Sequence, residues 1–394
     1  MKGSTTNMNR RNWLRNAGLL GAGLAAAPSV IAKPTSPRQT WYEGVRSWER
    51  SLAFTPKMEG LSARLLANEN PYGPSPMAKL AIMESVGMGN RYGHGDAAKL
   101  IDMLAEKEGV SKKQIMLGPG STDILEKTAI VLFKDGGNIV SADPAYMSLI
   151  KTAQSFGATW RSVPCNSDWS HDLDGMKKAI NADTKLVYIC NPNNPTGAIT
   201  DGRALYKFCD EVADQVPIFV DEAYLEFLPP ADQKSMVELV QKGKNLIIAR
   251  TFSKIHGMAG LRLGYGVAQP ELLEKISGMV RTTMGLNITT LRGGMASLKD
   301  ETFLKNCRKW NTEVREYTTE KLVSMGYDPI PSYTSFILFP LEAPTDGELF
   351  LKKMFDHGIG VRFFEIHNKP YCRVSMGTME ETGLFLDGLK KVIG

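Results

Sequence analysis

The chain has 394 residues, 43% of them hydrophobic and 23% charged, and its formal net charge is +5. This composition is typical of a soluble globular protein, and the length favours two domains or one domain with an added lobe, which excludes a disordered chain. Residues 1–32 hold four basic residues and no acidic one, which leaves 43 basic and 42 acidic residues in the body. A nearly neutral body without a basic stripe excludes nucleic acid as an expected partner.

Residues 1–32 are predicted to be a targeting segment. The pair Arg10-Arg11 precedes a short apolar run from Ala17 to Ala27, which is too brief to cross a bilayer. This order resembles a twin-arginine export signal and implies a periplasmic or exported protein that engages the twin-arginine machinery. The alternatives are a leader that is kept as a membrane anchor and an ordinary basic N-terminal helix; cleavage is expected after Ala27 or Ala32.

The five cysteines are widely spaced and odd in number, so they form neither a disulfide framework nor a CxxC metal motif. The histidines show no spacing typical of metal ligands, and we predict no metal site. Burial as structural thiols is the expected role of most of the cysteines.

Residues 33–89 are predicted to be a linker followed by an N-terminal arm. Lys33 to Pro37 is rich in Pro, Ser and Thr, and Trp41 to Trp48 is expected to form a short helix. Ala67 to Pro76 is dense in turn-forming residues, which indicates a defined, non-helical path. We expect this arm to complete the smaller domain.

From residue 115 onward, short apolar runs alternate with helix-length segments. Strands separated by helices predict an α/β fold: a mostly parallel sheet with helices on both faces, whose ligands lie at the carboxyl ends of the strands. We assign residues 90–285 to this large domain. The predicted strands are 115–117, 139–140, 186–190, 218–220, 246–249 and 263–267, and two predicted helices are 123–133 and 202–214.

The pattern changes after Arg281. A long polar helical stretch is predicted from about Leu291 to Met325, followed by strands at 335–339 and 371–375 with a helix between them. Residues 286–394 are therefore predicted to form a smaller α+β domain.

Lys254 follows the apolar run 246–249 at what is predicted to be a carboxyl strand end. A lysine shielded from water there has a lowered pKa, which frees a nucleophilic amine to form an imine with an aldehyde. Ser253 and Arg262 offer a hydroxyl and a guanidinium that suit phosphate oxygens. For this segment alone, the equal alternative is an exposed lysine beside an ordinary strand.

A second anion site is predicted where Gly120, Ser121 and Thr122 follow one strand and open a helix. Backbone amides at a helix start bind anions, and glycine lets a phosphate approach closely. The turn lacks the lysine of a nucleotide-binding P-loop and the third glycine of a dinucleotide motif. Tyr146 leaves the next strand and is predicted to stack on a planar ligand or to pack in the core.

Two further strand ends carry polar groups. Prolines and a glycine around Asn194 hold its amide in one place, where it can donate a hydrogen bond. Asp221 ends an apolar strand, and a carboxylate there is costly to bury unless it meets a cation such as a protonated ring nitrogen. Tyr224 is close enough in sequence to bind the same ligand.

These residues, in this order and spacing, resemble the cofactor site of fold type I pyridoxal-phosphate enzymes, specifically class I/II aminotransferases. The arm from Asn68 to Ser75 and the segment from Met258 to Arg262 are most similar to the histidinol-phosphate aminotransferase family. The resemblance covers roughly residues 60 to 394, and several independent motifs agree on it. It implies pyridoxal 5'-phosphate as the cofactor.

The resemblance also implies roles for single residues. Lys254 is expected to hold the cofactor as an internal aldimine and to carry the proton between substrate and cofactor, and Asp221 to keep the pyridine nitrogen protonated. Asn194 and Tyr224 are expected to bind the ring hydroxyl, and Tyr146 to stack on the ring. The phosphate is expected to contact Gly120, Ser121, Thr122, Ser253 and Arg262.

Three other positions follow from the same resemblance. Tyr92 is expected to reach the cofactor phosphate of the neighbouring subunit, which implies a homodimer with shared sites. Arg373 is expected to clamp a substrate carboxylate, and Tyr72 to contact substrate. Ser335 stands where the family commonly has asparagine, which leaves the substrate open. His256, two residues after Lys254, is interpreted as a structural histidine.

The predicted function is transamination between an L-amino acid, or an amine similar to histidinol phosphate, and a 2-oxo acid. Decarboxylation, β-elimination and racemisation remain alternatives on the same fold, because the bond that breaks is set by how substrate is held. A non-catalytic binding protein is the alternative of another class, and the presence of Lys254 disfavours it. Histidine synthesis is cytosolic, so an exported relative is expected to act on another amine and to load its cofactor before export.

Overall fold

A computed structural model describes residues 60–280 and 285–393. The predicted leader, the linker and the short helix expected at 41–48 lie outside these described residues. None of the helices in the described part of the chain has both the length and the apolar character that a membrane span requires.

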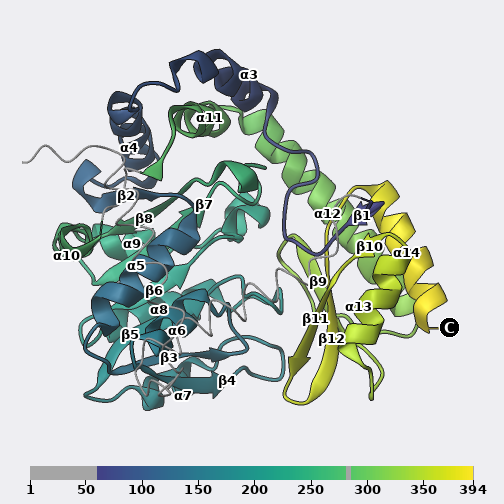
Figure 1. Cartoon of the computed structure of the whole chain (residues 1–394). Coiled ribbons are helices and arrows are strands. Elements are labelled where there is room, and N and C mark those ends of the chain that lie inside the picture. The colour runs from purple at the N-terminus through teal and green to yellow at the C-terminus, as the bar shows by residue number, and fades with distance from the viewer. Residues whose placement is uncertain (1–59, 281–284, 394) are drawn as a thin grey trace, which may run out of the picture. The chain divides into compact units, whose positions relative to one another are not determined.

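The centre of the large lobe is a seven-stranded sheet with the strand order β2-β8-β7-β6-β5-β3-β4 (Figure 1). Six strands run parallel, and β8 is antiparallel to both of its neighbours, β2 and β7. The α/β fold with a mostly parallel sheet is confirmed. The strands are β2 (Ile115–Gly118), β3 (Asn138–Asp143), β4 (Thr159–Pro164), β5 (Thr184–Cys190), β6 (Ile218–Asp221), β7 (Leu246–Thr251) and β8 (Gly264–Ala268).

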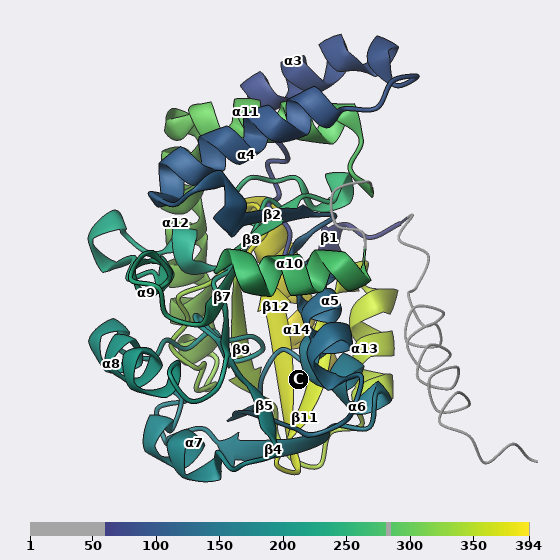
Figure 2. The same cartoon turned by 90° about the vertical axis from the view of Figure 1, so that its left-hand side faces the viewer.

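Both faces of this sheet are covered because successive side chains of a strand point to opposite sides. In β7, Leu246 and Ile248 pack into one apolar cluster, whereas Ile247 and Ala249 pack into another. Figure 2 shows the helices on either side of the strands. The first cluster includes α4 (His94–Glu108), α7 (Leu173–Ala179), α8 (Gly202–Val212) and α9 (Val237–Gln241), and the second includes α5 (Ser121–Phe133), α6 (Ser148–Ser155) and α10 (Pro270–Met279).

The small lobe contains a three-stranded antiparallel sheet, in the order β11-β12-β9, and a short parallel pair of β1 with β10. The pair places the N-terminal arm, through Ala63 and Arg64, in this lobe. The elements are β1 (Ala63–Arg64), β9 (Phe336–Pro340), β10 (Ile359–Gly360), β11 (Arg362–Ile366), β12 (Lys369–Ser375), α12 (Glu301–Ser324), α13 (Gly347–Asp356) and α14 (Met379–Ile393).

Between the arm and the large lobe, α3 (Pro76–Ser85) packs along α11 (Ile288–Lys299). The start of α3 is fixed locally, because the Ser75 hydroxyl accepts a hydrogen bond from the Ala78 amide at 3.1 Å and Pro76 occupies the first turn. Gly293 of α11 permits the close packing, since a Cβ there would lie 2.9 Å from Ile82.

Some elements differ from the sequence-based expectation. The helix predicted from 291 to 325 is two helices, because Asp300 ends α11 and its carboxylate caps α12 through the Phe303 amide at 3.2 Å. Strands β4, β10 and β11 were not predicted; β4 is largely exposed and so lacks the apolar signature of a central strand. Four of the cysteines are buried and all five are free, as expected.

Candidate active site

Three loops meet at the carboxyl ends of β5, β6 and β7, as expected for a parallel sheet. The strand register pairs Cys190 with Asp221 and Asp221 with Ala249, so the loops that follow these strands leave the sheet side by side. The loop after β5 carries Asn194, and the loop after β7 carries Lys254. The sheet therefore brings together side chains that lie up to sixty residues apart in the sequence.

Lys254 lies at this edge in the loop that follows β7. Its Nζ donates to the Asn68 carbonyl oxygen at 3.1 Å and lies 5.5 Å from the centre of the Tyr224 ring. Burial, aided by the positive charge of Arg373, lowers the pKa of Lys254 from 10.5 to about 8, although Asp221 opposes the shift. The neutral, nucleophilic amine is therefore accessible close to physiological pH.

Asp221, the last residue of β6, is a buried carboxylate with only 3% of its surface exposed. Among the described residues, its side chain accepts one hydrogen bond, from the Ala223 amide at 3.1 Å, and forms no ion pair. Burial raises its pKa from 3.8 to about 6, against the attraction of Lys254. An incompletely compensated buried carboxylate of this kind fits a cationic group of a ligand.

The other end of the site is an anion cradle at the start of α5. Gly120 has φ of 92°, and a Cβ there would lie 2.3 Å from Nη2 of Arg262. Nη1 of Arg262 donates to the Ser253 hydroxyl at 3.3 Å, and Nη2 donates to the Pro119 carbonyl at 3.2 Å. The structure thus gathers a guanidinium, a hydroxyl and the first amides of α5 around Ser121.

Tyr146 and Thr122 border this cradle. Burial raises the pKa of Tyr146, while a hydrogen bond with Thr122 opposes the shift. Tyr146 is only partly buried, so its ring retains surface that a ligand can contact.

Asn68, which our sequence analysis did not assign to the site, connects the arm to both lobes. Its Nδ2 donates to the Tyr224 hydroxyl at 2.8 Å, and its Oδ1 accepts from the Ser375 hydroxyl at 2.7 Å. Its carbonyl accepts from Lys254, as described above. One asparagine thereby orients the phenol and the amine that flank the site. The only sequence signal for it is its place in the turn-rich arm.

The arm also covers the loop that carries the lysine. Nδ2 of Asn70 donates to the Ile255 carbonyl at 2.8 Å. Gly257 has φ of 67°, and a Cβ there would lie 2.0 Å from the Gly73 carbonyl oxygen. The arm and the lysine loop are thus in direct backbone contact.

Arg373 enters the site from β12 of the small lobe. Its Nη1 donates to Oδ1 of Asn194 at 2.7 Å, and its guanidinium carbon lies 5.1 Å from the ring centres of both Phe336 and Phe364. Burial lowers its pKa to about 10, and its Nε has no hydrogen-bond partner among the described residues. A buried guanidinium with an unused donor is suited to a ligand carboxylate or phosphate.

A second arginine, which sequence reasoning missed, lies beside it. In the antiparallel pairing of β11 with β12, Arg362 is the direct partner of Arg373. Nε of Arg362 donates to the Leu66 carbonyl at 3.3 Å, and its positive charge contributes to the lowered pKa of Arg373. Two cations on one side of a site favour a ligand with more than one negative charge.

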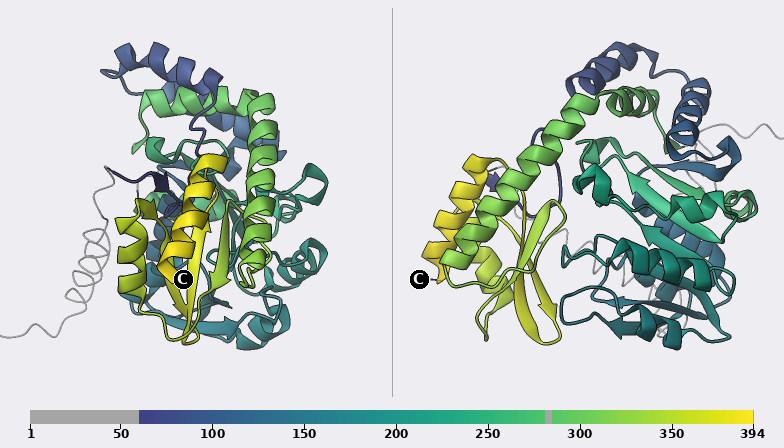
Figure 3. Two further views of the ribbon diagram at one scale, coloured as in Figure 1. Left: turned by 90° about the vertical axis from the view of Figure 1, so that its right-hand side faces the viewer. Right: turned by 180° about the vertical axis from the view of Figure 1, so that it is seen from behind.

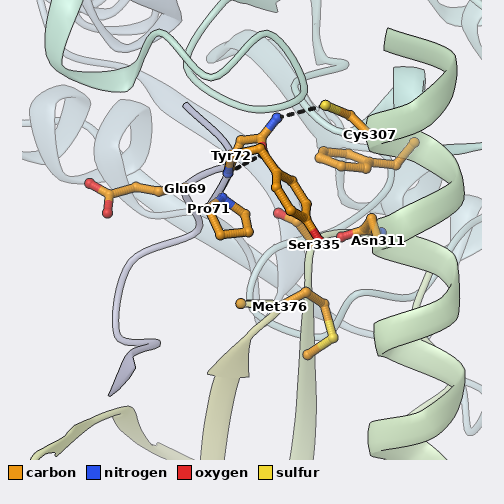
Figure 4. Close-up of a pocket in the computed structure, with 10 residues that line it drawn as sticks. Glu69, Pro71, Tyr72, Cys307, Asn311, Ser335 and Met376 are labelled. Atoms are coloured by element: carbon orange, nitrogen blue, oxygen red, sulfur yellow. Dashed lines mark hydrogen bonds between the residues drawn. The ribbon is translucent and has the colours of Figure 1, made fainter. Parts of the chain in front are cut away.

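Tyr72 lines a small pocket together with Cys307 of α12 and Met376 of the small lobe (Figure 4). Its ring lies 4.4 Å from that of Trp310. Ser335 and Asn311 line the same pocket, and the Ser335 hydroxyl is buried without a hydrogen-bond partner in the part of the chain that the structure describes. The pocket therefore offers an unused polar atom to a ligand side chain.

Two residues lie away from the site of their own chain. Tyr92 is 81% exposed and stacks only on His94, at 5.6 Å between ring centres. His256 points away from the ligand groups, because its Nδ1 lies 2.8 Å from the Ser297 hydroxyl and its Nε2 lies 3.5 Å from the Glu226 carboxylate. These contacts fit the structural role expected for His256.

Comparison with known proteins identifies the family. The sequence model for aminotransferase class I and II matches residues 63–389. The chain therefore belongs to the class I/II aminotransferases, which are pyridoxal-phosphate-dependent enzymes that transfer amino groups.

Curated relatives within that class carry a more specific name. Histidinol-phosphate aminotransferase 1 of Nitrosococcus oceani is 35% identical over 333 residues, which cover 84% of this chain and 89% of that protein. Histidinol-phosphate aminotransferase of Brevibacillus brevis is 36% identical over 331 residues, covering 84% of this chain and 90% of that protein.

Solved structures agree with this placement. Histidinol-phosphate aminotransferase of Sinorhizobium meliloti in complex with pyridoxal-5'-phosphate has a TM-score of 0.80 at 26% identity, covering 93% of this chain and 98% of that one. An L-threonine-O-3-phosphate decarboxylase from Porphyromonas gingivalis has a TM-score of 0.70 at 22% identity, covering 84% and 98%, and shares the fold alone.

Proposed function

We propose that this aminotransferase holds its cofactor through Lys254 and exchanges an amino group between an anionic amine and a 2-oxo acid. The observation that carries the proposal is the convergence of a partly buried lysine, a buried carboxylate and a buried arginine. The lysine lies beside Tyr224, the carboxylate is Asp221, and the arginine, Arg373, has an unused donor. Each of these groups has a shifted pKa, as catalytic sites often do.

The residues present fit pyridoxal phosphate. The cradle of Gly120 and Arg262 suits its phosphate, because glycine leaves the space in front of the guanidinium that a Cβ would fill. Asp221 suits its ring nitrogen, since the buried carboxylate has no ion-pair partner among the described side chains. The residues that would complete the site are Ser121, Thr122 and Ser253 at the phosphate, Asn194 and Tyr224 at the ring hydroxyl, and Tyr146 at the ring face.

When bound, the cofactor supplies an aldehyde that condenses with amines and a ring that accepts an electron pair from the neighbouring carbon. Lys254 would supply the proton transfer: its Nζ, whose pKa lies near 8, would take the proton from the substrate α-carbon and pass it to the cofactor. Asp221 holds a proton on the ring nitrogen, because a cation beside it removes the penalty of burying its charge. Asn68 keeps Tyr224 and Lys254 in place.

The paired arginines support an amine with a strong anionic group. Arg373 and Arg362 are opposite each other in the strand register, and Nε of Arg373 is unused. A carboxylate or a phosphate ester meets such donors with two parallel hydrogen bonds. Two donors are therefore tested: histidinol phosphate, in keeping with the names of the relatives, and L-amino acids, which the proposed export would favour.

The test is the visible absorbance of the purified holoenzyme during titration with single donors. We expect histidinol phosphate or one L-amino acid to bleach the imine band, and a 2-oxo acid to restore it. Bleaching by histidinol phosphate at lower concentration than by any amino acid would name the donor. Colour that persists with every amine, or release of carbon dioxide in place of a 2-oxo product, would contradict transamination by this chain.

We also propose a homodimer in which Tyr92 serves the partner's site. The support is an exposed apolar stripe on α3 and the residues after it, where Met77, Leu80, Met83 and Val86 are 46%, 53%, 66% and 62% exposed, with Tyr92 near its end. Mixing two inactive variants, Tyr92→Ala and Lys254→Ala, should restore activity, because one site of each mixed dimer has both residues. Failure to restore activity would contradict the shared site.

Export by the twin-arginine route is the third proposal. It rests on Arg10-Arg11 and the short apolar run behind them. Cell fractionation should find the protein outside the cytoplasm, and the double change Arg10→Lys, Arg11→Lys should retain it inside. Equal distribution of the two forms would contradict the proposal.

A further inference from the structure

A cleft of about 720 Å³ opens between three segments that the reaction does not use. One wall is the start of α8 with the residues before it, the second is residues 227–234, and the third is α12 together with Tyr333. Figure 3 shows the length of α12 from two sides. Apart from Phe227, no lining residue is shared with the pocket of Tyr72, and none belongs to the cofactor cradle. The cleft thus adjoins the pocket of Tyr72 at Phe227 but is otherwise lined by different residues.

Four cationic side chains line this cleft: Arg203, Lys234, Arg308 and Arg315. Within residues 60–280 and 285–393, none of them forms an ion pair with a carboxylate, although eighteen ion pairs occur elsewhere in that part of the chain. Unpaired cations gathered at one concave surface raise the local concentration of anions. We propose that this cleft is a second binding site, for a small oxyanion such as a carboxylate or phosphate.

Arg315 is one of the two cations of this cleft that are partly buried. Burial lowers its pKa, although the negative charge of Glu316 opposes the shift. Only one of its nitrogens, Nη1, has a hydrogen-bond partner among the described residues, the Thr334 carbonyl oxygen at 3.2 Å. The remaining donors of the guanidinium are available for an oxyanion.

The cleft also contains three carboxylates, which limit the ligand's size and charge. Oδ1 of Asp201 already accepts from the amides of Arg203 and Ala204, at 3.1 and 2.9 Å, because it caps α8. Asp232 and Glu316 are exposed at the rim. A small anion can contact the cations and avoid these two groups, whereas an extended polyanion would be repelled.

Arg308 and Arg315 of α12 also form hydrogen bonds with residues next to the active site. These contacts determine which residues can be changed to test the proposal. Arg315 and Asn311 both donate to the Thr334 carbonyl, which directly precedes Ser335 of the substrate-side pocket. Nε of Arg308 donates at 2.9 Å to the carbonyl of Glu226, two residues after Tyr224. Changing either arginine would disturb the active site, so the test variants belong on the opposite wall, at Arg203 and Lys234.

The experiment is isothermal titration calorimetry of the full-length holoenzyme with inorganic phosphate and, separately, with citrate. We expect at least one of the two to bind, and the variant Arg203→Gln/Lys234→Gln to bind it roughly tenfold more weakly. Lys207→Gln and Lys309→Gln are matched controls, because these side chains are 80% and 70% exposed on α8 and α12 and do not line the cleft. A thermal melt confirms that each variant is folded.

A further variant separates this cleft from the active site. Arg373→Lys should retain the binding of phosphate or citrate, because Arg373 does not line the cleft. Phosphate binding alone would point to a phosphorylated ligand, and citrate binding alone to a carboxylate. The proposal is overturned if neither anion binds at millimolar concentration, if the double variant binds like the wild type, or if Arg373→Lys alone removes binding.

Discussion

The carboxyl edge of the large sheet and the small lobe bring different groups to one site. At the sheet edge, strand register places Asp221, and Lys254 follows β7 in the adjacent loop; burial shifts the pKa values of both. In the small lobe, Arg373 and Arg362 lie opposite each other on two strands and present charge to whatever enters. Under the proposed function, the sheet edge would provide the chemistry and the small lobe would select the substrate.

Removal of the lysine amine is the largest expected effect. Lys254→Ala should lower kcat by roughly 10⁴-fold or more, because no other described residue replaces an amine at this strand end. Circular dichroism should show an unchanged fold, since within the described residues the Lys254 side chain makes a single hydrogen bond, to Asn68. Wild-type turnover in this variant would show that the reaction does not need the Lys254 amine.

Asp221→Asn should separate activity from stability. Activity should fall roughly a hundredfold or more, because the amide cannot hold a proton on a ring nitrogen. Burial raises the pKa of Asp221 from 3.8 to about 6, so ionisation of this carboxylate destabilises the folded state as pH rises through that range. The asparagine does not ionise, and the apoprotein of the variant should therefore be more stable than the wild type at pH 8, by roughly 2 kcal/mol. Urea unfolding of both apoproteins at pH 4 and pH 8 measures this; a gain that is equal at both values would contradict it.

The arginine pair should affect substrate affinity more than turnover. Arg373→Lys should raise KM for the amine roughly tenfold to a hundredfold, because lysine lacks the two parallel donors. Arg362→Lys is the matched comparison on the partner strand and should have a smaller effect, since Arg362 is exposed. If Arg373→Lys changes kcat and leaves KM unchanged, the proposal that the small lobe selects the substrate is contradicted.

The pH dependence of cofactor loading gives the smallest effect. The neutral amine attacks an aldehyde, and the pKa of Lys254 near 8 means that the neutral fraction rises about tenfold from pH 7 to above pH 9. Loading of the apoprotein with pyridoxal phosphate should accelerate by a similar factor and then level off. Stopped-flow absorbance measures the rate. A rise that continues to pH 10.5 would show that Lys254 has the ordinary pKa.

The sheet edge could be predicted from the sequence because each of its residues follows a short apolar run directly. Asn194, Asp221 and Lys254 come within a few residues of the strands that position them. Local turn chemistry likewise indicated the anion cradle, where Gly120 precedes a helix. Such signals lie within one segment, so periodicity and turn formers are enough to find them.

The small lobe was less predictable, because its residues meet through long-range pairing. Arg362 is adjacent to Arg373 only because β11 pairs with β12, and β11 was not predicted. Asn68 reaches Tyr224 and Ser375 across 156 and 307 residues of sequence. Neither the arginine pair nor the hydrogen bonds of Asn68 produce a pattern within one segment of the sequence. The first depends on the register of β11 with β12, and the second on the folded path of the arm.

The central claim is that Lys254 carries the cofactor. The most direct measurement is borohydride reduction of the holoenzyme, followed by proteolysis and tandem mass spectrometry of the modified peptides. We predict a phosphopyridoxyl group on Lys254 and on no other lysine of the chain. The same group on a different lysine, or an unmodified Lys254 in protein that has lost its colour on reduction, would contradict the account.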